Sequence, residues 1–408
     1  MYELYDYQKI NVERMRQILD ENNFCLNLSK MGTGKTVVAT ALAISSTFAH
    51  VLIISAPTVL NQNWVPWLKR CDLDYELITI NTLRGKKNTT LSHPYLIRND
   101  PPMSDVSYEA TKCWMDRCAA GMLVIVDEMQ ICKNENLSTS ALTALLRPIV
   151  DGKGSSKILL MSGTPVDNED QIATYLKILG QDHESNHSID YFTGPFMAQY
   201  GATMPGDAQA MEQEFRGYYS YYKLGPLNLV GDVKSQLQTL EMAKVGIFAQ
   251  LAKRALSGDG NTKVIVGLYF IRSIERLQTM MRGYGGATII GATKRAERTK
   301  ILEAFQRPDT KSRLLIANVD IIKEGINLGD EDGRFPRICY VNNGYIPLQQ
   351  LIYRFIRTNT RSAAQLHIVV CEDIDERQLI ESQHRRCAVI EQFTDCINPS
   401  NFDIIHHG

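Results

Sequence analysis

One short motif, SKMGTGKT at residues 29–36, limits the possible folds of this chain more than any other. It follows the apolar run Phe24–Leu28, which has the length of a buried strand, and it precedes a segment of helical periodicity, Thr36–Ser46. A strand, a glycine loop and a helix in this order predict a phosphate-binding loop, because glycines let backbone N–H groups approach an anion at the positive end of a helix. The alternative, a chance glycine turn before a helix, does not explain the Lys-Thr pair that follows the second glycine.

The motif also assigns roles to its residues. We expect the nucleotide to be held by Met31, Gly32, Thr33, Gly34, Lys35 and Thr36. Lys35 would neutralise the β- and γ-phosphates, and the Thr36 hydroxyl would bind Mg²⁺. The first glycine of the usual pattern is replaced by Ser29.

A pair of carboxylates at the end of another apolar run completes the predicted site. Asp127 and Glu128 follow directly after residues 123–126, which read Leu-Val-Ile-Val. Asp127 would anchor Mg²⁺, and Glu128 would orient and deprotonate the attacking water, so the pair predicts hydrolysis of ATP. In isolation the pair could instead be a solvated strand end, but its place after a phosphate-binding loop favours the catalytic interpretation.

Apolar runs and helical segments alternate along the chain, which predicts an α/β fold with parallel sheets. The expected strands are Phe24–Ser29, Val51–Ser55, Leu123–Asp127, Ile158–Ser162, Lys263–Phe270, Ala287–Gly291, Arg313–Ala317, Arg337–Val341 and Leu366–Cys371. The expected helices are Thr36–Ser46, Ser138–Leu146, Asp170–Leu179, Val233–Leu256, Ile271–Met281, Ala296–Phe305 and Glu376–Phe393. We therefore expect an ATP-binding lobe at 1–180, a partly helical insertion at 181–260 and a second lobe at 261–408.

Composition excludes several classes of protein. The 44 Lys and Arg residues balance 45 Asp and Glu residues, so a globally basic nucleic-acid binder is excluded. A local excess remains at Lys294–Arg313, which holds seven basic and three acidic residues and is either a phosphate-facing patch or a solvated helix. Apolar runs are too short to span a membrane, the N-terminus lacks a signal sequence, and the nine cysteines form no zinc pattern. We expect an intracellular protein, in the nucleus, host cytoplasm or virion.

Further motifs lie along the chain in an order that a known protein family shares. They are Gln8 within LYDYQ, the APT segment at 56–58, DEMQ at 127–130, LLMSGTP at 159–165, KVIV at 263–266, IIGAT at 289–293, EGINL at 324–328 and QLIYRFIR at 350–357. In this order the sequence resembles the superfamily 2 helicases and translocases, and within them the Swi/Snf-type DNA-dependent ATPases. The resemblance implies two RecA-like lobes that bind ATP and Mg²⁺ between them.

The resemblance also implies site residues. Gln8 would read the adenine edge, and Gln130, Ser162 and Thr164 would couple the nucleotide to nucleic acid. Arg354 and Arg357 would be catalytic, with Arg357 as the arginine finger, and Gly325 and Gln350 would complete the nucleotide site. Nucleic-acid contacts are implied at Pro57, Thr58, Ser162, Thr164, Gly291, Thr293 and Asn327.

Some motifs depart from the Swi/Snf pattern. Ile322 and Lys323 replace two glycines, and the tyrosine-rich segment 215–223 stands where an Arg-Arg-x-Lys box is usual. These features look more like the nucleoside triphosphatase I-type ATPases of large DNA viruses. We expect translocation along double-stranded DNA without sequence specificity, with a strand-separating DNA or RNA helicase and an ATPase subunit of a viral transcription complex as alternatives. A transcription or replication complex remains open as a partner.

Two local features have simpler interpretations. Trp64 and Trp67, next to the APT segment, favour core packing over base stacking. His406 and His407 favour a frayed tail over a metal site.

Overall fold

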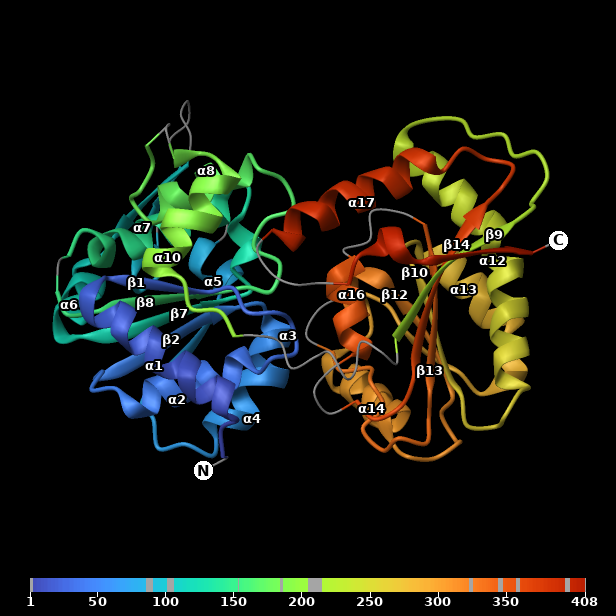
Figure 1. Cartoon of the computed structure of the whole chain (residues 1–408), viewed down its shortest axis with the longest axis horizontal. Coiled ribbons are helices and arrows are strands. Elements are labelled where there is room, and N and C mark those ends of the chain that lie inside the picture. Colours follow the sequence, from blue (N-terminus) through green and yellow to red (C-terminus); the bar gives the residue numbers. More distant parts are fainter. Residues whose placement is uncertain are drawn as a thin grey trace. The chain divides into compact units, whose positions relative to one another are not determined.

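The computed structural model describes residues 3–85, 91–100, 106–152, 154–183, 186–204, 215–322, 326–343, 348–356, 360–392 and 397–407. The chain forms two compact units (Figure 1). Unit 1 comprises Met1–Gly206 with Ala388–Cys396, and unit 2 comprises Asp207–Cys387 with Ile397–Gly408. The residues of the expected insertion are divided between the two units, with 181–206 in unit 1 and 207–260 in unit 2.

Unit 1 is built on a five-stranded parallel sheet with the order β1-β8-β7-β2-β3. Its strands are β1 (Phe24–Asn27), β2 (His50–Ser55), β3 (Tyr75–Thr79), β7 (Met122–Asp127) and β8 (Lys157–Met161). Alternate side chains of these strands enter different cores, which explains why the runs are continuously apolar. Leu26 and Val124 pack in the core that contains α7 (Leu137–Val150) and α8 (Gln171–Ile178). Cys25 and Leu123 pack in the core that contains α1 (Asp6–Glu21) and α2 (Lys35–Ser45).

Smaller elements surround this sheet. A three-stranded antiparallel sheet has the order β4-β5-β6, with β4 (Leu91–His93), β5 (Leu96–Asn99) and β6 (Ser107–Ala110). The short helices are α3 (Pro57–Val59), η1 (Leu60–Trp64), α4 (Val65–Leu68), α5 (Ile80–Arg84), α6 (Lys112–Ala120), η2 (Met129–Cys132), α9 (Ile189–Tyr191), η4 (Phe192–Phe196) and α10 (Met197–Tyr200).

Unit 2 is built on a seven-stranded parallel sheet with the order β11-β12-β10-β13-β14-β9-β15. Its strands are β9 (Phe215–Tyr222), β10 (Lys263–Leu268), β11 (Ala287–Ile289), β12 (Leu314–Asn318), β13 (Arg337–Asn342), β14 (Ala364–Cys371) and β15 (Asp403–His407). The helices are α12 (Val233–Leu256), α13 (Ile271–Met280), η5 (Arg282–Tyr284), α14 (Arg295–Gln306), α15 (Val319–Ile322), α16 (Leu348–Phe355), α17 (Arg377–Glu391) and η6 (Pro399–Asn401). Phe248 of α12 and Leu277 of α13 share one core with Val264 and Val266 of β10.

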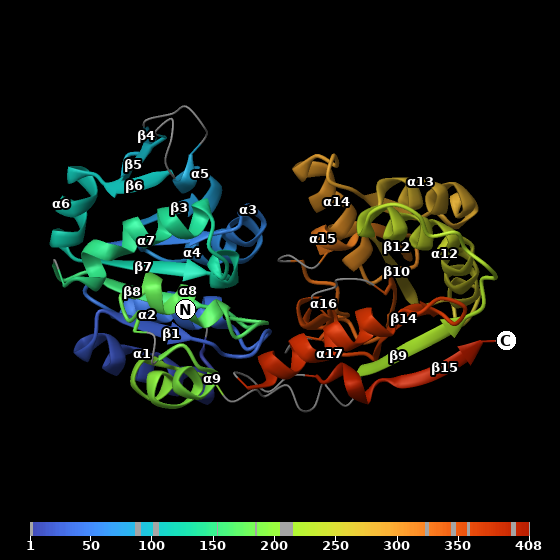
Figure 2. The same cartoon turned by 90° about the horizontal axis from the view of Figure 1, so that it is seen from above.

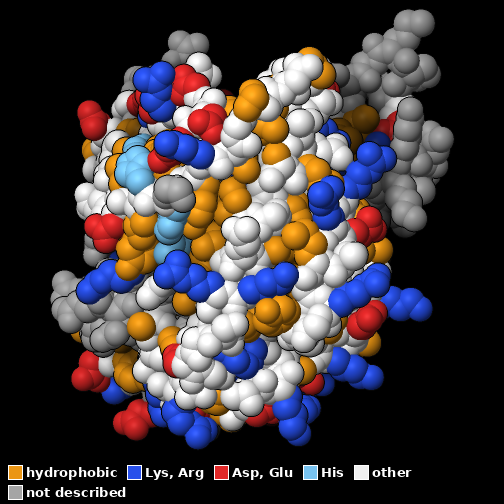
Figure 3. Space-filling model, turned by 90° about the vertical axis from the view of Figure 1, so that its right-hand side faces the viewer, with side chains coloured by type: hydrophobic (Ala, Val, Ile, Leu, Met, Phe, Trp, Pro, Cys, Tyr) orange, Lys and Arg blue, Asp and Glu red, His pale blue; other side chains and the backbone are white. Residues whose placement is uncertain are grey.

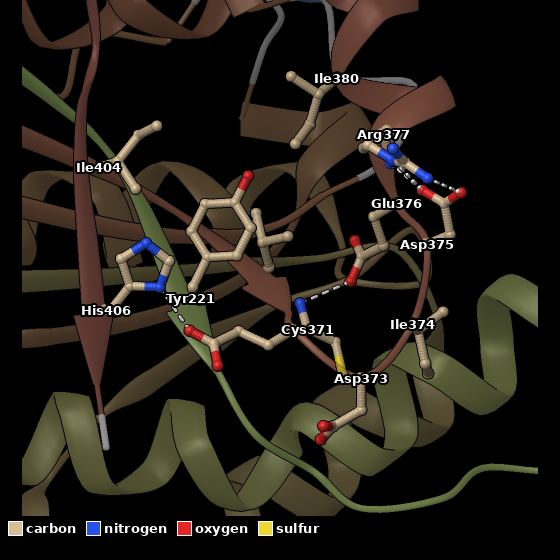
Figure 4. A pocket seen from close by; sticks show the side chains of 12 residues that line it. Tyr221, Cys371, Asp373, Ile374, Asp375, Glu376, Arg377, Ile380, Ile404 and His406 are labelled. Carbon is tan, nitrogen blue, oxygen red and sulfur yellow. Dashed lines mark hydrogen bonds and ion pairs between the residues drawn. The ribbon is translucent and has the colours of Figure 1, made fainter.

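Two segments differ from the sequence-based interpretation. The tyrosine-rich segment is strand β9, which pairs with β14 on one side and β15 on the other (Figure 2). The last residues are not a frayed tail, because they form β15. Cross-strand ring pairs hold β15 in place, with Tyr222 and His407 stacked at a centroid distance of 4.2 Å. His406 lies against Tyr221 and bonds to the Glu372 carboxylate (Figure 4).

The histidines of this strand therefore have structural partners. Among the described residues, no cluster of three or more His, Cys, Asp and Glu side chains could hold a metal ion.

The space-filling view in Figure 3 shows hydrophobic and histidine side chains together on one face, bordered by lysines and arginines. No helix of the described ranges is both long enough and apolar enough to cross a membrane. The two parallel sheets with flanking helices confirm the predicted α/β fold class.

Candidate active site

The predicted phosphate-binding loop connects β1 to α2, as its sequence requires. Gly32 and Gly34 have φ angles of 86° and 88°, in the left-handed region that favours glycine. A Cβ on Gly34 would also lie 2.5 Å from the Gln8 amide nitrogen. Gly34 is thus required both by its backbone conformation and by the close approach of Gln8.

The Lys35 ammonium lies inside the loop. Its Nζ donates to the carbonyl oxygens of Ser29 at 2.7 Å and Lys30 at 3.1 Å. Ser29, the residue in place of the first glycine, is buried, and its hydroxyl bonds to Asn27 Oδ1 and accepts the Met204 N–H. The serine therefore anchors the start of the loop, which explains how the motif accommodates a side chain there.

Gln8 holds the other side of the loop. Its amide Nε2 donates to the Thr33 carbonyl at 3.1 Å, and its Oε1 accepts the Tyr5 N–H at 3.2 Å. The residue is buried, so the side chain connects the start of α1 to the glycine loop. The structure places the predicted adenine reader next to the phosphate loop, and contact with a base stays a prediction.

Asp127 ends β7 as a buried carboxylate, with 6% of its surface exposed. One oxygen accepts the Trp64 indole N–H at 2.8 Å and the other accepts the Glu128 backbone N–H at 3.0 Å. Burial and the neighbouring Glu128 carboxylate raise the pKa of Asp127, whereas the Trp64 bond and the Lys35 charge lower it. A cation beside this carboxyl would stabilise its ionised form, so its environment fits a metal ligand.

Glu128 has an unusual backbone. Its φ of 59° and ψ of 48° are left-handed, and it is the only described non-glycine residue with a positive φ. Such a conformation costs of order 1–3 kcal/mol and is concentrated at functional sites. The turn directs the chain from β7 into η2, and it occurs at the residue predicted to be the catalytic base.

A chain of hydrogen bonds leads away from Glu128. Gln130 Nε2 donates to the Glu128 carboxylate, and Gln130 Oε1 accepts the Ser162 hydroxyl at 2.6 Å. The Ser162 hydroxyl in turn accepts the Thr164 backbone N–H at 3.0 Å. The structure thus brings the predicted coupling residues together. Ser162 and Thr164 are 1% and 8% exposed, and both their coupling role and their contacts with nucleic acid stay predictions.

A second set of polar contacts reaches α8. The Lys133 ammonium pairs with the Asp167 carboxylate at 2.8 Å. The Gln171 amide donates to Asp167 at 2.9 Å and to Asn134 at 3.2 Å. The segment after Glu128 is therefore fixed to the segment after Ser162 by side-chain bonds as well as by the pairing of β7 with β8.

The segment around Trp64 contributes a residue whose role sequence reasoning missed. Trp64 is fully buried, which fits the predicted core packing, but its indole also holds Asp127. Only the unusual combination of a core tryptophan and a buried carboxylate could have suggested this pair. Upstream of Trp64, Pro57 is exposed and Thr58 half-buried, so both are accessible for the predicted contacts.

The predicted contact residues of unit 2 differ in their surroundings. Gly291 is exposed, and a Cβ there would meet nothing within 4 Å. The Thr293 hydroxyl accepts the Ile290 N–H at 3.0 Å and caps the turn after β11. The Asn327 amide donates to Glu331 at 2.6 Å and accepts the Gly329 N–H, so it stabilises its own loop. Their contacts with nucleic acid stay predictions.

The remaining predicted nucleotide residues lie on or near α16. Arg354 is 4% exposed and Gln350 is half-buried, both within unit 2. Arg357 and Gly325 lie outside the described residues.

The basic run starts at Lys294, the N-cap of α14. Five of its cations are exposed: Lys294, Arg295, Lys300, Arg307 and Lys311. Leu302 and Phe305 bury the opposite side of the helix. Helix α14 is therefore amphipathic, but its exposed side also carries Glu297 and Glu303, and Arg307 and Lys311 lie beyond its end.

Comparison with known proteins agrees with this architecture. Residues 246–332 match the family model described as the helicase conserved C-terminal domain. The structure is similar to the crystal structure of the Hef helicase domain of Pyrococcus furiosus, with a TM-score of 0.51 and 10% sequence identity over 92% of this chain and 97% of that chain. The chain has the two-lobe RecA-like helicase fold. No curated protein matches it in sequence.

The fold and the domain match together support a helicase-type, nucleic-acid-dependent ATPase. The residues of unit 1 fit ATP with Mg²⁺. Lys35 and the left-handed glycines form a loop suited to phosphates, and the buried Asp127 carboxyl is close enough to Lys35 for the ammonium to lower its pKa. When bound, Mg²⁺ would neutralise phosphate charge and be held by Asp127 and Thr36.

Proposed function

We propose that this protein is a Swi/Snf-like motor that couples ATP hydrolysis to translocation along double-stranded DNA. Lys35 would bind the phosphates, Asp127 the metal, and Glu128 would take the proton from the attacking water. Exposed cations such as those on α14 would hold the DNA through its phosphates, without reading sequence.

The observation that best supports the proposal is the hydrogen-bonded chain from Glu128 through Gln130 to Ser162 and Thr164. Movement or protonation of the Glu128 carboxylate would change the hydrogen bonds of Gln130, and Gln130 bonds to Ser162 in the loop after β8. Polar contacts thus link two segments of unit 1, and a motor requires such contacts to change with the state of the nucleotide.

A strand-separating helicase is the second candidate, and the similarity to the Hef helicase domain favours it. An ATPase subunit of a viral transcription complex is a third, motivated by the departures from the Swi/Snf motifs. The three differ in which nucleic acid accelerates hydrolysis and in whether a partner is needed.

The test is phosphate release by the pure full chain with no nucleic acid, duplex DNA, single-stranded DNA or RNA. We expect the largest stimulation by duplex DNA, followed by displacement of a triplex-forming strand without duplex separation. Glu128→Gln is the negative control. Glu135→Gln is its matched control, because this carboxylate is exposed and pairs with the exposed Lys177 ammonium.

If only single-stranded DNA or RNA stimulates ATP hydrolysis, and the protein also unwinds a duplex, the strand-separating helicase would replace the proposed translocase. Absence of stimulation by every nucleic acid, with ATP still bound, would favour the subunit of a larger complex. Absence of ATP hydrolysis in the presence of all three would refute the motor.

A further inference from the structure

Unit 2 contains a pocket of about 540 Å³ that the predicted ATP chemistry does not use. It lies at the carboxyl ends of β9 and β14, beside β15 and the first turns of α17 (Figure 4). Tyr221 and His406 line it from the strands, and Ile380 lines it from the helix. Its volume is in the range of small-molecule sites in proteins.

The charge around the pocket beside β15 is mainly negative. Four lining residues carry carboxylates and one carries a guanidinium, namely Glu372, Asp373, Asp375 and Glu376 against Arg377. Arg377 is already paired with Asp375 at 2.9 Å. Two further positive groups lie at the wall, the Lys244 ammonium and the start of α17, which carries about half an elementary charge. The carboxylates outnumber these positive groups, so the pocket favours a cation.

One carboxylate oxygen in this wall has no partner. Glu376 is 3% exposed, and its Oε1 accepts the Cys371 N–H at 2.8 Å and the Lys244 ammonium at 2.7 Å. Its Oε2 is buried and has no hydrogen-bond partner across the described residues. Figure 4 shows this second oxygen directed into the space between Tyr221 and Ile380. Because an unpaired buried oxygen is costly, it points to a ligand that supplies a donor.

The remaining wall of the pocket suits an alkyl chain. The Tyr221 and His406 rings are stacked, with their centroids 5.2 Å apart. The Ile380 side chain is half-buried, and that of Ile404 is 62% exposed. The methylene stem of a basic group packs along such surfaces while its charged head stays with polar partners.

The arrangement of the carboxylates favours an organic cation over a metal ion. Within the described ranges, no group of three or more His, Cys, Asp and Glu side chains is placed to hold a metal. Glu372 bonds to His406 on β15, whereas Asp373 accepts the Leu224 and Gly225 N–H groups at 2.8 Å and 2.9 Å. The negative groups are thus fixed to different segments around the pocket, which fits a ligand that extends across it.

Strand β15 offers a place for such a ligand to come from a protein. It is the last strand in the sheet order, and among the described strands it pairs with β9 alone. Its other edge therefore presents backbone groups with which an extended segment can pair. Ile404 and His406 of this strand line the pocket, so alternate side chains of an added strand would point to the same face.

We propose that the pocket beside β15 binds an alkylammonium group, with the ammonium bonded to Glu376 Oε2 and the alkyl stem along Ile380 and Ile404. The group belongs either to a lysine side chain of a protein segment that pairs with β15 or to a free polyamine. Neither source depends on the proposed motor function.

The test uses the full chain without nucleotide or nucleic acid, at physiological ionic strength. Two probes are titrated by calorimetry: spermidine, and the blocked peptide acetyl-Val-Thr-Lys-Thr-Val-amide, which has the period-two pattern of a strand. The same peptide with norleucine in place of lysine lacks the ammonium. Peptide binding that requires the lysine identifies the side-chain source, and binding of spermidine alone identifies the polyamine. Binding of both supports the pocket as a site for either source.

Substitutions then locate the binding site. Glu376→Gln keeps the shape of the side chain and removes its charge, so the dissociation constant should rise at least about tenfold. Because this change also weakens the partner of buried Lys244, two substitutions nearer the surface test the pocket independently. Ile404→Lys supplies a tethered ammonium at the pocket and should displace both probes, and Glu372→Gln should weaken both. Glu381→Gln, an exposed carboxylate farther along α17, should bind as the parent does.

The proposal is overturned if the parent binds neither spermidine nor the lysine peptide. It is also overturned if Ile404→Lys and Glu372→Gln both bind the probes as the parent does. A loss in Glu381→Gln equal to that in Glu372→Gln would attribute the binding to general surface charge and would likewise refute the pocket. Each of these outcomes leaves the proposed motor intact, since none involves ATP or nucleic acid.

Discussion

The indole of Trp64 should control metal binding although it lies outside every expected catalytic motif. Trp64→Phe keeps an aromatic ring in the core but removes the N–H that donates to Asp127 at 2.8 Å. Asp127 is 6% exposed and Trp64 is 0% exposed, so no water replaces the lost donor easily. The carboxylate would lose the bond that orients it toward a bound cation.

The size of the effect follows from the kind of bond. A hydrogen bond to a charged group contributes about 1.5–3 kcal/mol, and each 1.4 kcal/mol is a factor of ten in an equilibrium constant. Loss of a side chain that orients a metal ligand typically costs about 10–100-fold in metal affinity, which is the same range. We therefore expect the dissociation constant of Mn²⁺ in the presence of ADP to rise by about 10–100-fold.

The assay is titration of free Mn²⁺ by electron paramagnetic resonance, with unfolding in guanidinium measured in parallel. Trp114→Phe is a matched control. Trp114 is also fully buried in unit 1, and its indole donates at 2.7 Å to the Leu145 carbonyl instead of to a carboxylate. The control should lose stability but keep its Mn²⁺ affinity. Equal Mn²⁺ affinities of Trp64→Phe and the wild type would refute the reasoning.

Three other results are expected. Glu128→Gln should still bind ATP but hydrolyse it at least about 10²-fold more slowly, measured as phosphate release, because it removes the general base; unchanged turnover would exclude Glu128 from that role. Lys244→Met should lower the free energy of unfolding by about 3–5 kcal/mol in urea titrations, because it leaves the Glu376 carboxylate as an unpaired buried charge. In the wild type this carboxylate is 1% exposed and lies 2.7 Å from the Lys244 ammonium. The double variant Lys244→Met with Glu376→Gln should recover part of the loss, and strictly additive losses of the two single variants would contradict the pairing. In EDTA, the melting temperature should fall as the pH rises from about 4 through the raised pKa of Asp127, because the folded chain holds this proton to a higher pH than the unfolded chain does. Addition of Mg²⁺, or the Asp127→Asn substitution, should flatten this pH dependence. A melting temperature that rises with pH over this range would be inconsistent with the prediction.

Local patterns were enough to predict the parallel strands and the phosphate-binding loop. Continuous apolar runs mark strands buried on both faces, and the glycines at 32 and 34 have the left-handed conformation that their motif implies. The same reasoning missed β3, the small antiparallel sheet and β15, since their strands are short or only partly buried. Strand β9 was missed because it is only partly buried and its sequence shows neither a continuous apolar run nor a regular alternation.

Residue types and their spacing along the chain were sufficient to indicate ATP chemistry, since strand-loop-helix geometry and strand-end carboxylates are local properties. Pairs that lie far apart in sequence were not predictable in this way. Trp64 meets Asp127, Ser29 meets Met204 and Glu241 meets Tyr269 only after the sheets have assembled. The physical reason is that a hydrogen bond between distant residues depends on the register and packing of whole elements, which no single segment of the chain encodes.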